Sequence, residues 1–207
     1  MWAVMGLGNP GREYTRTRHN VGFEFIKRLA RRWDTRVRKR SHLSKLIRVD
    51  RPEGKVLLVM PQTFMNSSGR AARSLVDQGG LQAGRMVVVF DDFDLPLGEI
   101  RIRREGSGGS HKGMASIIDE LGTREISRIR IGIGPMPAEA DSVEYVLSPF
   151  TGEELQRLTA PLDRAAEALE MILAGDIDAA MNRFNPFQPP AISPPQPPTL
   201  KGKVEDH

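Results

Sequence analysis

The chain has 207 residues, 39% of them hydrophobic, which suits one globular domain with a buried core. Cysteine is absent, so disulfides, thiolate metal sites and a cysteine nucleophile are excluded, and no apolar run approaches the roughly 20 residues of a membrane-spanning helix. The net charge is only +4, but eleven lysines and arginines lie between residues 27 and 51 while acidic residues gather after residue 150, which predicts a basic face separate from an acidic one.

The basic run has two interpretations. A concentrated basic face would attract a phosphate backbone without reading its sequence. A solvated, highly charged helix would give the same pattern. The run alone does not separate these alternatives.

A short apolar strand is predicted at residues 2–5, and a glycine-rich turn follows it. Gly6, Gly8 and Gly11 satisfy the G-x-G-x-x-G spacing of dinucleotide-binding turns. We reject that interpretation because the sequence Asn-Pro-Gly at 9–11 favours a turn, and the polar residues that follow show no apolar helix face. A nucleotide-cofactor enzyme therefore has no other support in the sequence.

The rest of the chain alternates short strands with helices, which predicts an α/β layered domain. Two of the strands, 99–103 and 128–133, each present arginines on one face, and the proline-rich end predicts a disordered tail. The other strands are expected at 46–49, 55–60 and 86–90, and the helices at 21–33, 71–76, 114–121, 151–174 and 177–184.

His19 is the leading catalytic candidate. Imidazole is the side chain whose unperturbed pKa lies nearest neutrality, so it can take a proton from water and return it. His19 stands between a sharp turn and the start of a helix, a more suggestive setting than those of His42, His111 and the terminal His207. Asn9 ends the first strand within reach of His19, although it could simply form an Asx turn.

An acidic segment follows the predicted strand at 86–90, at the strand end where an open α/β sheet places its site. Carboxylates there could bind a metal, but no second acidic cluster accompanies them. Orienting a histidine is therefore the more economical role. The three carboxylates are Asp91, Asp92 and Asp94.

Two further loops lie at predicted strand ends. Asn66 or Ser67 could cap the helix that follows strand 55–60, and capping is a strong alternative to any role in binding. The glycine-rich residues 106–113 precede a helix and include Lys112, which makes a reasonable cradle for a phosphate or a single strand.

Five motifs together resemble the bacterial-type peptidyl-tRNA hydrolases: GLGNPG, TRHNVGF, PQTFMNSSG, DDFDLPLG with GSGGSHKG, and RIRIGIGP. The resemblance covers residues 2–187. It implies a single globular α/β domain at 1–187, with a mixed, mostly parallel central sheet flanked by helices, and leaves 188–207 as a proline-rich disordered tail. It also implies a monomeric, cytoplasmic protein that needs neither metal nor cofactor.

The resemblance implies hydrolysis of the ester between a peptide and the 3′-terminal ribose of tRNA, which frees tRNA for reuse in translation. Carried over by position, it makes His19 the general base that activates water and Asp91 the partner that orients it. Asn9 would read the blocked α-amino end of the substrate, and Asn66 could orient the water or stabilise the oxyanion.

The expected partner is peptidyl-tRNA, through its 3′ CCA end and acceptor-stem phosphates. Lys112 stands where the family usually has Asn; an ammonium only donates and carries charge, so Lys112 could hold a phosphate or attract the substrate less selectively. His111 could contact substrate or only support its loop. The residues expected to bind substrate or tRNA are Tyr14, Phe64, Met65, Asn66, Arg103, His111, Lys112 and Arg130.

A non-catalytic RNA-binding adaptor is the alternative function, because relatives in plant plastids serve as RNA-splicing partners. The presence of His19, Asp91, Asn9 and Asn66 argues against it.

Overall fold

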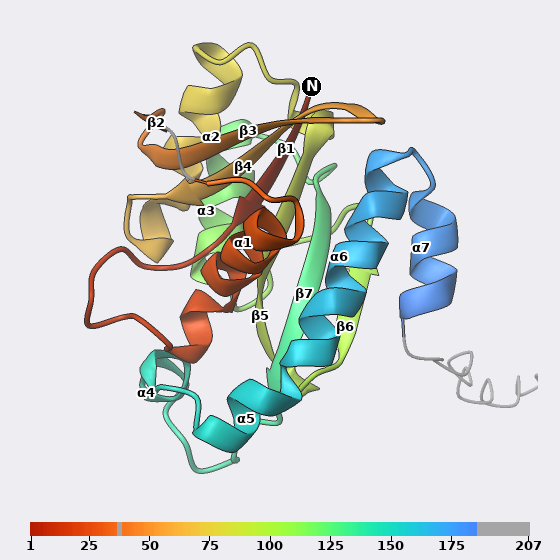
Figure 1. The fold of residues 1–207 in the computed structure, drawn as a ribbon. Coiled ribbons are helices and arrows are strands. Elements are labelled where there is room, and N and C mark those ends of the chain that lie inside the picture. The colour runs from red at the N-terminus through yellow and green to blue at the C-terminus, as the bar shows by residue number, and fades with distance from the viewer. Residues whose placement is uncertain (37–38, 186–207) are drawn as a thin grey trace, which may run out of the picture.

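A seven-stranded mixed sheet forms the centre of the molecule (Figure 1). The computed structural model describes residues 1–36 and 39–185, and its strands are β1 (Trp2–Gly6), β2 (Lys39–Ser41), β3 (Ser44–Arg51), β4 (Gly54–Pro61), β5 (Met86–Pro96), β6 (Ile100–Arg103) and β7 (Ser127–Gly134). Their order is β2-β3-β4-β1-β5-β7-β6. The central pairs β4–β1, β1–β5 and β5–β7 are parallel, whereas the outer pairs β2–β3, β3–β4 and β7–β6 are antiparallel.

Helices cover both faces of this sheet (Figure 1). They are α1 (Val21–Arg32), α2 (Ser68–Asp77), α3 (Lys112–Leu121), α4 (Ser142–Leu147), α5 (Gly152–Arg157), α6 (Thr159–Leu173) and α7 (Ile177–Phe184), with short 3-10 turns η1 (Arg18–Asn20), η2 (Met65–Ser67) and η3 (Ala83–Arg85). Alternate strand residues enter two cores, as Val4 and Met5 do: one core lies against α1, α6 and α7, the other against α2 and α3. The predicted α/β domain with a mixed, helix-flanked sheet is confirmed.

The sequence suggested a loop at the acidic segment, but the structure has a strand there. β5 continues through it, with Asp91 opposite Ile131 and Asp92 opposite Gly132 of β7. The strand persists because its backbone is paired with β7 and because the buried carboxylates have partners, described below.

The helix predicted over 151–174 is two helices, α5 and α6, which meet at Leu158. Pro161 is the cause: it has no N–H to donate to the carbonyl of Arg157, so the helical hydrogen-bond ladder is interrupted there. Proline is tolerated in the first turn of α6 because an N–H at that position needs no intrahelical partner.

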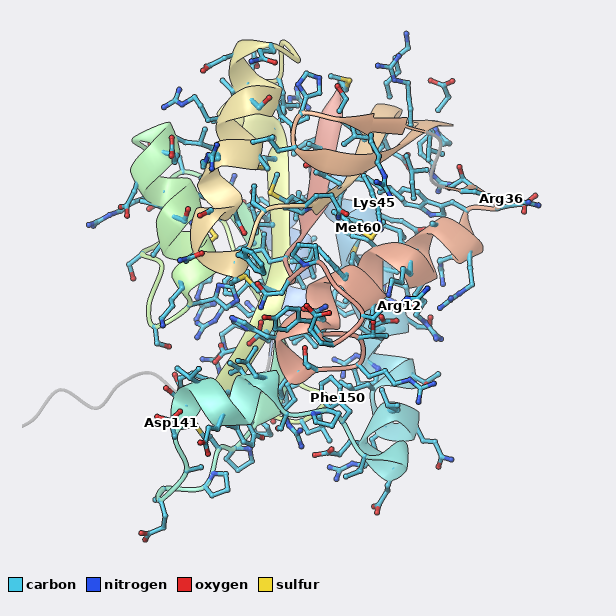
Figure 2. All side chains as sticks on the ribbon, turned by 90° about the vertical axis from the view of Figure 1, so that its left-hand side faces the viewer. Arg12, Arg36, Lys45, Met60, Asp141 and Phe150 are labelled. Carbon is cyan, nitrogen blue, oxygen red and sulfur yellow. The ribbon has the colours of Figure 1, made fainter. Side chains whose placement is uncertain are left out.

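The basic run does not form a face separate from the acidic residues. Arg28 of α1 donates to both carboxylate oxygens of Asp163 on α6, at 2.7 and 2.6 Å, and Arg32 and Arg51 both pair with Glu170 of α6. The expectation of separate faces is therefore wrong for these residues, because α1 and α6 pack on the same face of the sheet. Exposed cations outside these pairs include Arg12 and Arg36, labelled in Figure 2.

The edge strand β6 is covered by an amide. Asn185, just after α7, accepts a hydrogen bond from the Ile102 N–H through Oδ1 at 2.6 Å, and its Nδ2 donates to the Ile102 carbonyl at 3.1 Å. This side chain thus takes the place of a neighbouring strand. The predicted tail at 188–207 lies outside the described residues. None of the helices in the described ranges has the length and apolarity needed to cross a membrane.

Candidate active site

His19 lies in η1, the single turn between the loop after β1 and the start of α1. The loop is fixed by a reciprocal amide pair: the Asn9 N–H donates to Asn20 Oδ1 at 2.8 Å, and Asn20 Nδ2 donates to the Asn9 carbonyl at 3.0 Å. His19 is 9% exposed. The turn therefore holds a nearly buried imidazole beside the end of β1.

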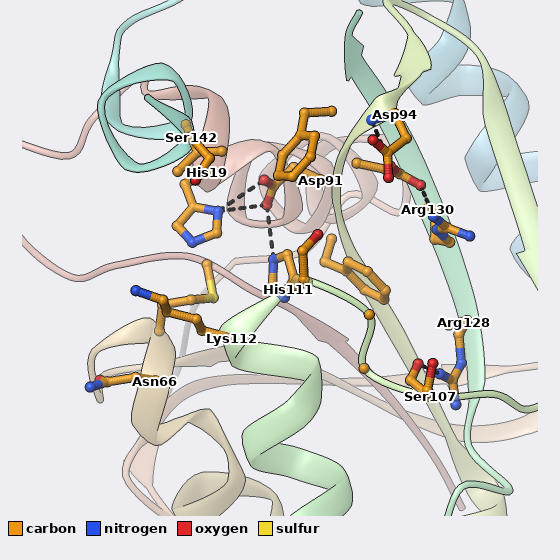
Figure 3. Close-up of a pocket in the computed structure, with 18 of the residues that line it drawn as sticks. His19, Asn66, Asp91, Asp94, Ser107, His111, Lys112, Arg128, Arg130 and Ser142 are labelled. Atoms are coloured by element: carbon orange, nitrogen blue, oxygen red, sulfur yellow. Dashed lines mark hydrogen bonds and ion pairs between the residues drawn. The ribbon is translucent and has the colours of Figure 1, made fainter. Parts of the chain in front are cut away.

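Asp91 on β5 lies directly against this imidazole (Figure 3). His19 Nδ1 is 2.9 Å from both Asp91 oxygens, and the carboxylate is 3% exposed. An ionised carboxylate can only accept, so Nδ1 carries the proton and donates it. The predicted pairing of these two residues is present in the structure.

His111 contacts the same carboxylate, and its ring centroid lies 5.0 Å from that of His19 (Figure 3). Its Nε2 is 3.0 Å from Asp91 Oδ1, while its Nδ1 accepts the N–H of Met114 at 3.1 Å and so caps α3. A nitrogen that accepts a backbone N–H carries no proton, which leaves the proton of the neutral ring on Nε2. Both ring nitrogens of His111 are thus occupied within the protein.

The pKa of Asp91 reflects opposing influences. Burial acts to raise it, but attraction to His19 and His111, together with the hydrogen bonds from both rings, lowers the pKa well below its ordinary value. Asp91 is therefore ionised throughout the physiological range and stays an acceptor for both rings.

The Nε2 atom of His19 has no hydrogen-bond partner in the described part of the chain. His19 lines a cavity of about 480 Å³, together with Asn9, Phe64, Met65, Asn66, Asp91, Arg103, His111, Lys112, Arg130 and residues of α4. An imidazole held with Nδ1–H on a carboxylate and Nε2 unpaired at a cavity is arranged to take a proton from a bound molecule.

The same residues include atoms that could ligate a metal ion. The nitrogens of His19 and His111 and a carboxylate oxygen of Asp91 lie within 4.8 Å of one another, the one such group found in residues 1–36 and 39–185. These atoms already face each other as donors and acceptor, so a metal between them would have to displace both ring protons. The donor set thus fits proton transfer better than metal ligation.

Asn9 does not form the Asx turn that its sequence allowed. Its Oδ1 accepts the N–H of Met65 at 2.8 Å, which ties the first loop to η2. Its Nδ2 has no partner among the described residues, and Asn9 lines the cavity. Asn9 therefore offers the cavity a donor in a fixed position.

The η2 segment forms another part of the wall. Asn66 is exposed and lines the cavity, and neither Asn66 nor Ser67 caps α2 with its side chain, so the capping alternative is wrong. Phe64 is 58% exposed, and its ring meets that of Tyr14 edge-on at 6.4 Å between centroids. Tyr14 thus borders the cavity through Phe64 and is not itself among the lining residues.

The arginines of β6 and β7 lie at the other end of the cavity. Arg103 and Arg130 line it, and Arg130 forms an ion pair with the buried Asp92. Burial and the charges of Arg101 and Arg130 lower the pKa of Arg103. Lys112 is exposed at the first residue of α3, on the same wall as His111.

Arg128 lies on the same face of β7 as Arg130 and pairs with Arg103 of β6, as the sequence predicted, but its side chain is buried. It is 3% exposed and donates to four backbone carbonyls, including Gly106 and Ser107 at 2.8 Å. Arg128 thus holds the glycine-rich loop in place.

Sequence reasoning missed several residues that build the site. Asn20 and Arg18 flank His19 in the motif TRHN, but the motif does not reveal their partners. The sequence pattern presents Asp92 only as one of three acids, and it does not predict α4. The signal for α4 is Asp141, whose side chain accepts two N–H groups of its first turn.

Three comparisons with known proteins point to one family. The sequence profile of the family described as peptidyl-tRNA hydrolase matches residues 3–192. Peptidyl-tRNA hydrolases of Chloroflexus aggregans and Carboxydothermus hydrogenoformans are 44% and 48% identical, over 90% and 89% of this chain and 100% and 98% of their own lengths. A crystal structure of peptidyl-tRNA hydrolase from Acinetobacter baumannii superposes with a TM-score of 0.83 at 28% identity, covering 91% of this chain and 96% of that one.

Proposed function

The chain belongs to the peptidyl-tRNA hydrolase family, and we propose that it cleaves peptidyl-tRNA with His19 as general base and Asp91 as the partner of that base. The activity is hydrolysis of the ester between a peptide and the 3′-terminal ribose of tRNA. One observation carries the assignment of the base: Asp91 holds the Nδ1–H of His19, which leaves Nε2 unpaired at the cavity.

The reaction needs only one proton to be moved and returned. Nε2 of His19 takes a proton from water while the water oxygen attacks the ester carbonyl carbon. The carbonyl oxygen becomes an oxyanion, and the ionised Asp91 stabilises the imidazolium that has formed. The carbon–oxygen bond to the ribose then breaks, and the ribose 3′ oxygen takes the proton from Nε2.

Asn9 distinguishes a blocked amine from a free one. Its Nδ2 is a donor held at the cavity, because Oδ1 is occupied by the Met65 N–H. A blocked amino end carries an acyl oxygen that can accept from Nδ2, whereas a charged free amine can only donate. We assign oxyanion stabilisation to Asn66 or Lys112, which reach the cavity as an amide and an ammonium.

His111 acts on the base through Asp91. With both nitrogens occupied, it has none left for substrate, so we infer that it fixes the orientation of the carboxylate.

The tRNA end would bind along the rest of the cavity. Arg103, Arg130 and Lys112 supply cations for phosphates, and the exposed Phe64 with Tyr14 supplies aromatic faces for the bases of the 3′ CCA end. We propose that the protein acts as a cytoplasmic monomer and that residues 1–187 suffice for catalysis. If the chain truncated after Phe187 turns over as fast as the full chain and has a monomeric mass in solution, both the monomeric state and the sufficiency of residues 1–187 are supported.

The deciding experiment measures release of an N-acetyl-aminoacyl group from tRNA by the wild type and by His19→Ala. Unblocked aminoacyl-tRNA is the comparison substrate. Cleavage of the blocked form alone, reduced at least about 10³-fold in His19→Ala, is expected for loss of the base. Binding of tRNA without cleavage by the wild type would favour the adaptor function instead.

A further inference from the structure

The wall of the cavity opposite η2 is α4, a helix of only six residues. Ser142, Val143, Val146 and Leu147 of α4 line the cavity with His19. Figure 2 shows α4 beneath the start of α1, with Asp141 at one end of this segment and Phe150 at the other. So short a helix has little stability of its own, so its position depends on what attaches it.

Arg18, the residue before His19, contributes to that attachment, together with the Tyr145 hydroxyl, which donates to the Ile133 carbonyl at 2.6 Å, and the Phe150 N–H, which donates to the Arg16 carbonyl at 3.0 Å. Arg18 Nη1 donates to the Pro149 carbonyl at 2.7 Å and to Ser148 Oγ at 2.9 Å, and its Nη2 donates to Glu154 Oε1 at 2.6 Å. The Arg18 N–H donates to the Ser148 carbonyl at 3.0 Å. One residue therefore binds the end of α4 through both its backbone and its side chain.

Aromatic rings hold the guanidinium from its faces. Its central carbon lies 4.9 Å from the ring centre of Tyr145, on α4, and 5.2 Å from that of Phe150. Arg18 is 8% exposed, and its Nε is buried without a hydrogen-bond partner. A buried cation of this kind persists only where its other contacts are firmly placed.

Glu154 is placed by its own helix. In the capping box of α5, Glu154 Oε2 accepts the Thr151 N–H at 2.7 Å, which turns Oε1 toward Arg18. Burial acts to raise the pKa of Glu154, but the Thr151 hydrogen bond and the charge of Arg18 lower it overall. The carboxylate is thus an ionised, fixed partner for the guanidinium.

We propose that Arg18 is a positioning residue that joins the catalytic base to the α4 wall, so that His19 and the wall of the substrate cavity keep one fixed relation. Arg18 and His19 are neighbours in the same 3-10 turn, so the contacts of Arg18 with residues 148–154 act on the backbone that carries the imidazole. This inference rests on the proposed role of His19.

The test compares Arg18→Lys with a matched control, Arg28→Lys. Arg28 also forms a bidentate ion pair, with the carboxylate of Asp163. This pair joins α1 to α6, and Arg28 does not line the cavity. Lysine keeps the charge but cannot reach Ser148, Pro149 and Glu154 together. The readouts are kcat and KM for N-acetyl-aminoacyl-tRNA, the Kd for uncharged tRNA, and the imidazole ¹⁵N signals that report the tautomer of His19.

We expect Arg18→Lys to lower kcat by about 10–100-fold, to leave the Kd for uncharged tRNA unchanged, and to shift the His19 signals away from the pure Nδ1–H form. Arg28→Lys should leave kcat, KM, the Kd and the His19 signals unchanged. Equal loss of kcat in both variants, or none in Arg18→Lys, would overturn the proposal.

Glu154→Gln decides the matter if Arg18→Lys does not fold. Glutamine can keep the capping box while removing the charge, so a smaller loss of kcat is expected, about 3–10-fold. No loss in this variant would also overturn the proposal. Failure of the underlying function is separate, since it would appear as full activity in His19→Ala.

Discussion

Replacing Asp91 by asparagine should inactivate the enzyme by moving a proton on His19. Two N–H donors face the carboxylate, one from His19 and one from His111. Asparagine offers one acceptor oxygen and places an NH₂ donor at the other position. Both rings reach Oδ1, but only His19 Nδ1 also lies 2.9 Å from Oδ2, so the NH₂ group that takes the Oδ2 position faces His19 and favours an acceptor there.

His111 is the ring that keeps its tautomer. If its proton moved to Nδ1, the Met114 N–H would lose its acceptor, and a buried unpaired group costs about 1–3 kcal/mol. His19 has no such constraint because its Nε2 faces the cavity. The proton of His19 should therefore move to Nε2, where it blocks the reaction.

The expected loss follows from two contributions. The tautomer preference of about 1–3 kcal/mol reduces the active form by roughly 5–150-fold. Loss of the charge that stabilises the imidazolium adds to it, which gives a fall in kcat of about 10³-fold, or about 4 kcal/mol. The assay is release of the N-acetyl-aminoacyl group from tRNA under single-turnover conditions.

A second substitution should restore part of the activity. Asparagine at position 111 can still cap α3 but is too short to occupy the oxygen of residue 91. In Asp91→Asn with His111→Asn, that oxygen can accept the Nδ1–H of His19, and we expect kcat about tenfold above that of Asp91→Asn. His111→Asn alone is the control. A double variant slower than Asp91→Asn, or Asp91→Asn within tenfold of wild type, would refute the tautomer reasoning.

Three further predictions concern other contacts. Asp92→Asn removes the carboxylate that competes with phosphate for Arg130. The variant should therefore bind tRNA several-fold more tightly at low salt, and the slope of log binding constant against log salt concentration should be steeper by up to about one. Weaker binding would show instead that the ion pair holds Arg130 in position for phosphate. Asn185→Ala should lower the free energy of unfolding, measured in urea, by about 1–3 kcal/mol, because both hydrogen bonds to Ile102 are lost. The variant should leave kcat unchanged. A loss of stability below about 0.5 kcal/mol would show that water replaces the amide. Folding lowers the pKa of Asp91, so the stabilisation that Asp91 provides should be complete above the unfolded carboxyl pKa of about 3.9 and disappear as pH falls toward the lower folded value. The free energies of unfolding of wild type and Asp91→Asn, measured in urea, should therefore converge at low pH. A constant difference between them from pH 6 to pH 3 would contradict the assignment.

The regular elements were predictable because their signals are local. The apolar stripe of α1 and the apolar run that begins β5 follow from residue periodicity alone. The continuation of β5 through Asp91 and Asp92 was not predictable in this way, since aspartate is disfavoured in strands. Its support comes from pairing with β7 and from His19, His111 and Arg130, all distant in sequence.

The break between α5 and α6 shows the opposite situation. Thr151 and Glu154 form a capping box, and Pro161 marks a first helical turn, so both signals were present in the sequence. The amphipathic pattern across residues 151–174 concealed them, because it continues in phase through Leu158, which is buried in the same core. Capping residues and proline should therefore take precedence over hydrophobic periodicity when the two signals disagree.

The candidate site was likewise predictable only where its signals are local in the sequence. His19, Asp91 and Asn9 could be named from the sequence, because imidazole, carboxylate and amide at strand ends suit hydrolysis and the motifs match a family. The sequence could not show which ring nitrogen of each histidine carries the proton. That depends on the hydrogen bond from the Met114 N–H, which fixes the tautomer of His111 and leaves His19 as the base. The asymmetry between the two histidines is thus set by a helix cap, a contact that has no signature in composition or charge. Exchanging that cap for one without a ring, as in His111→Asn, tests whether the asymmetry governs catalysis.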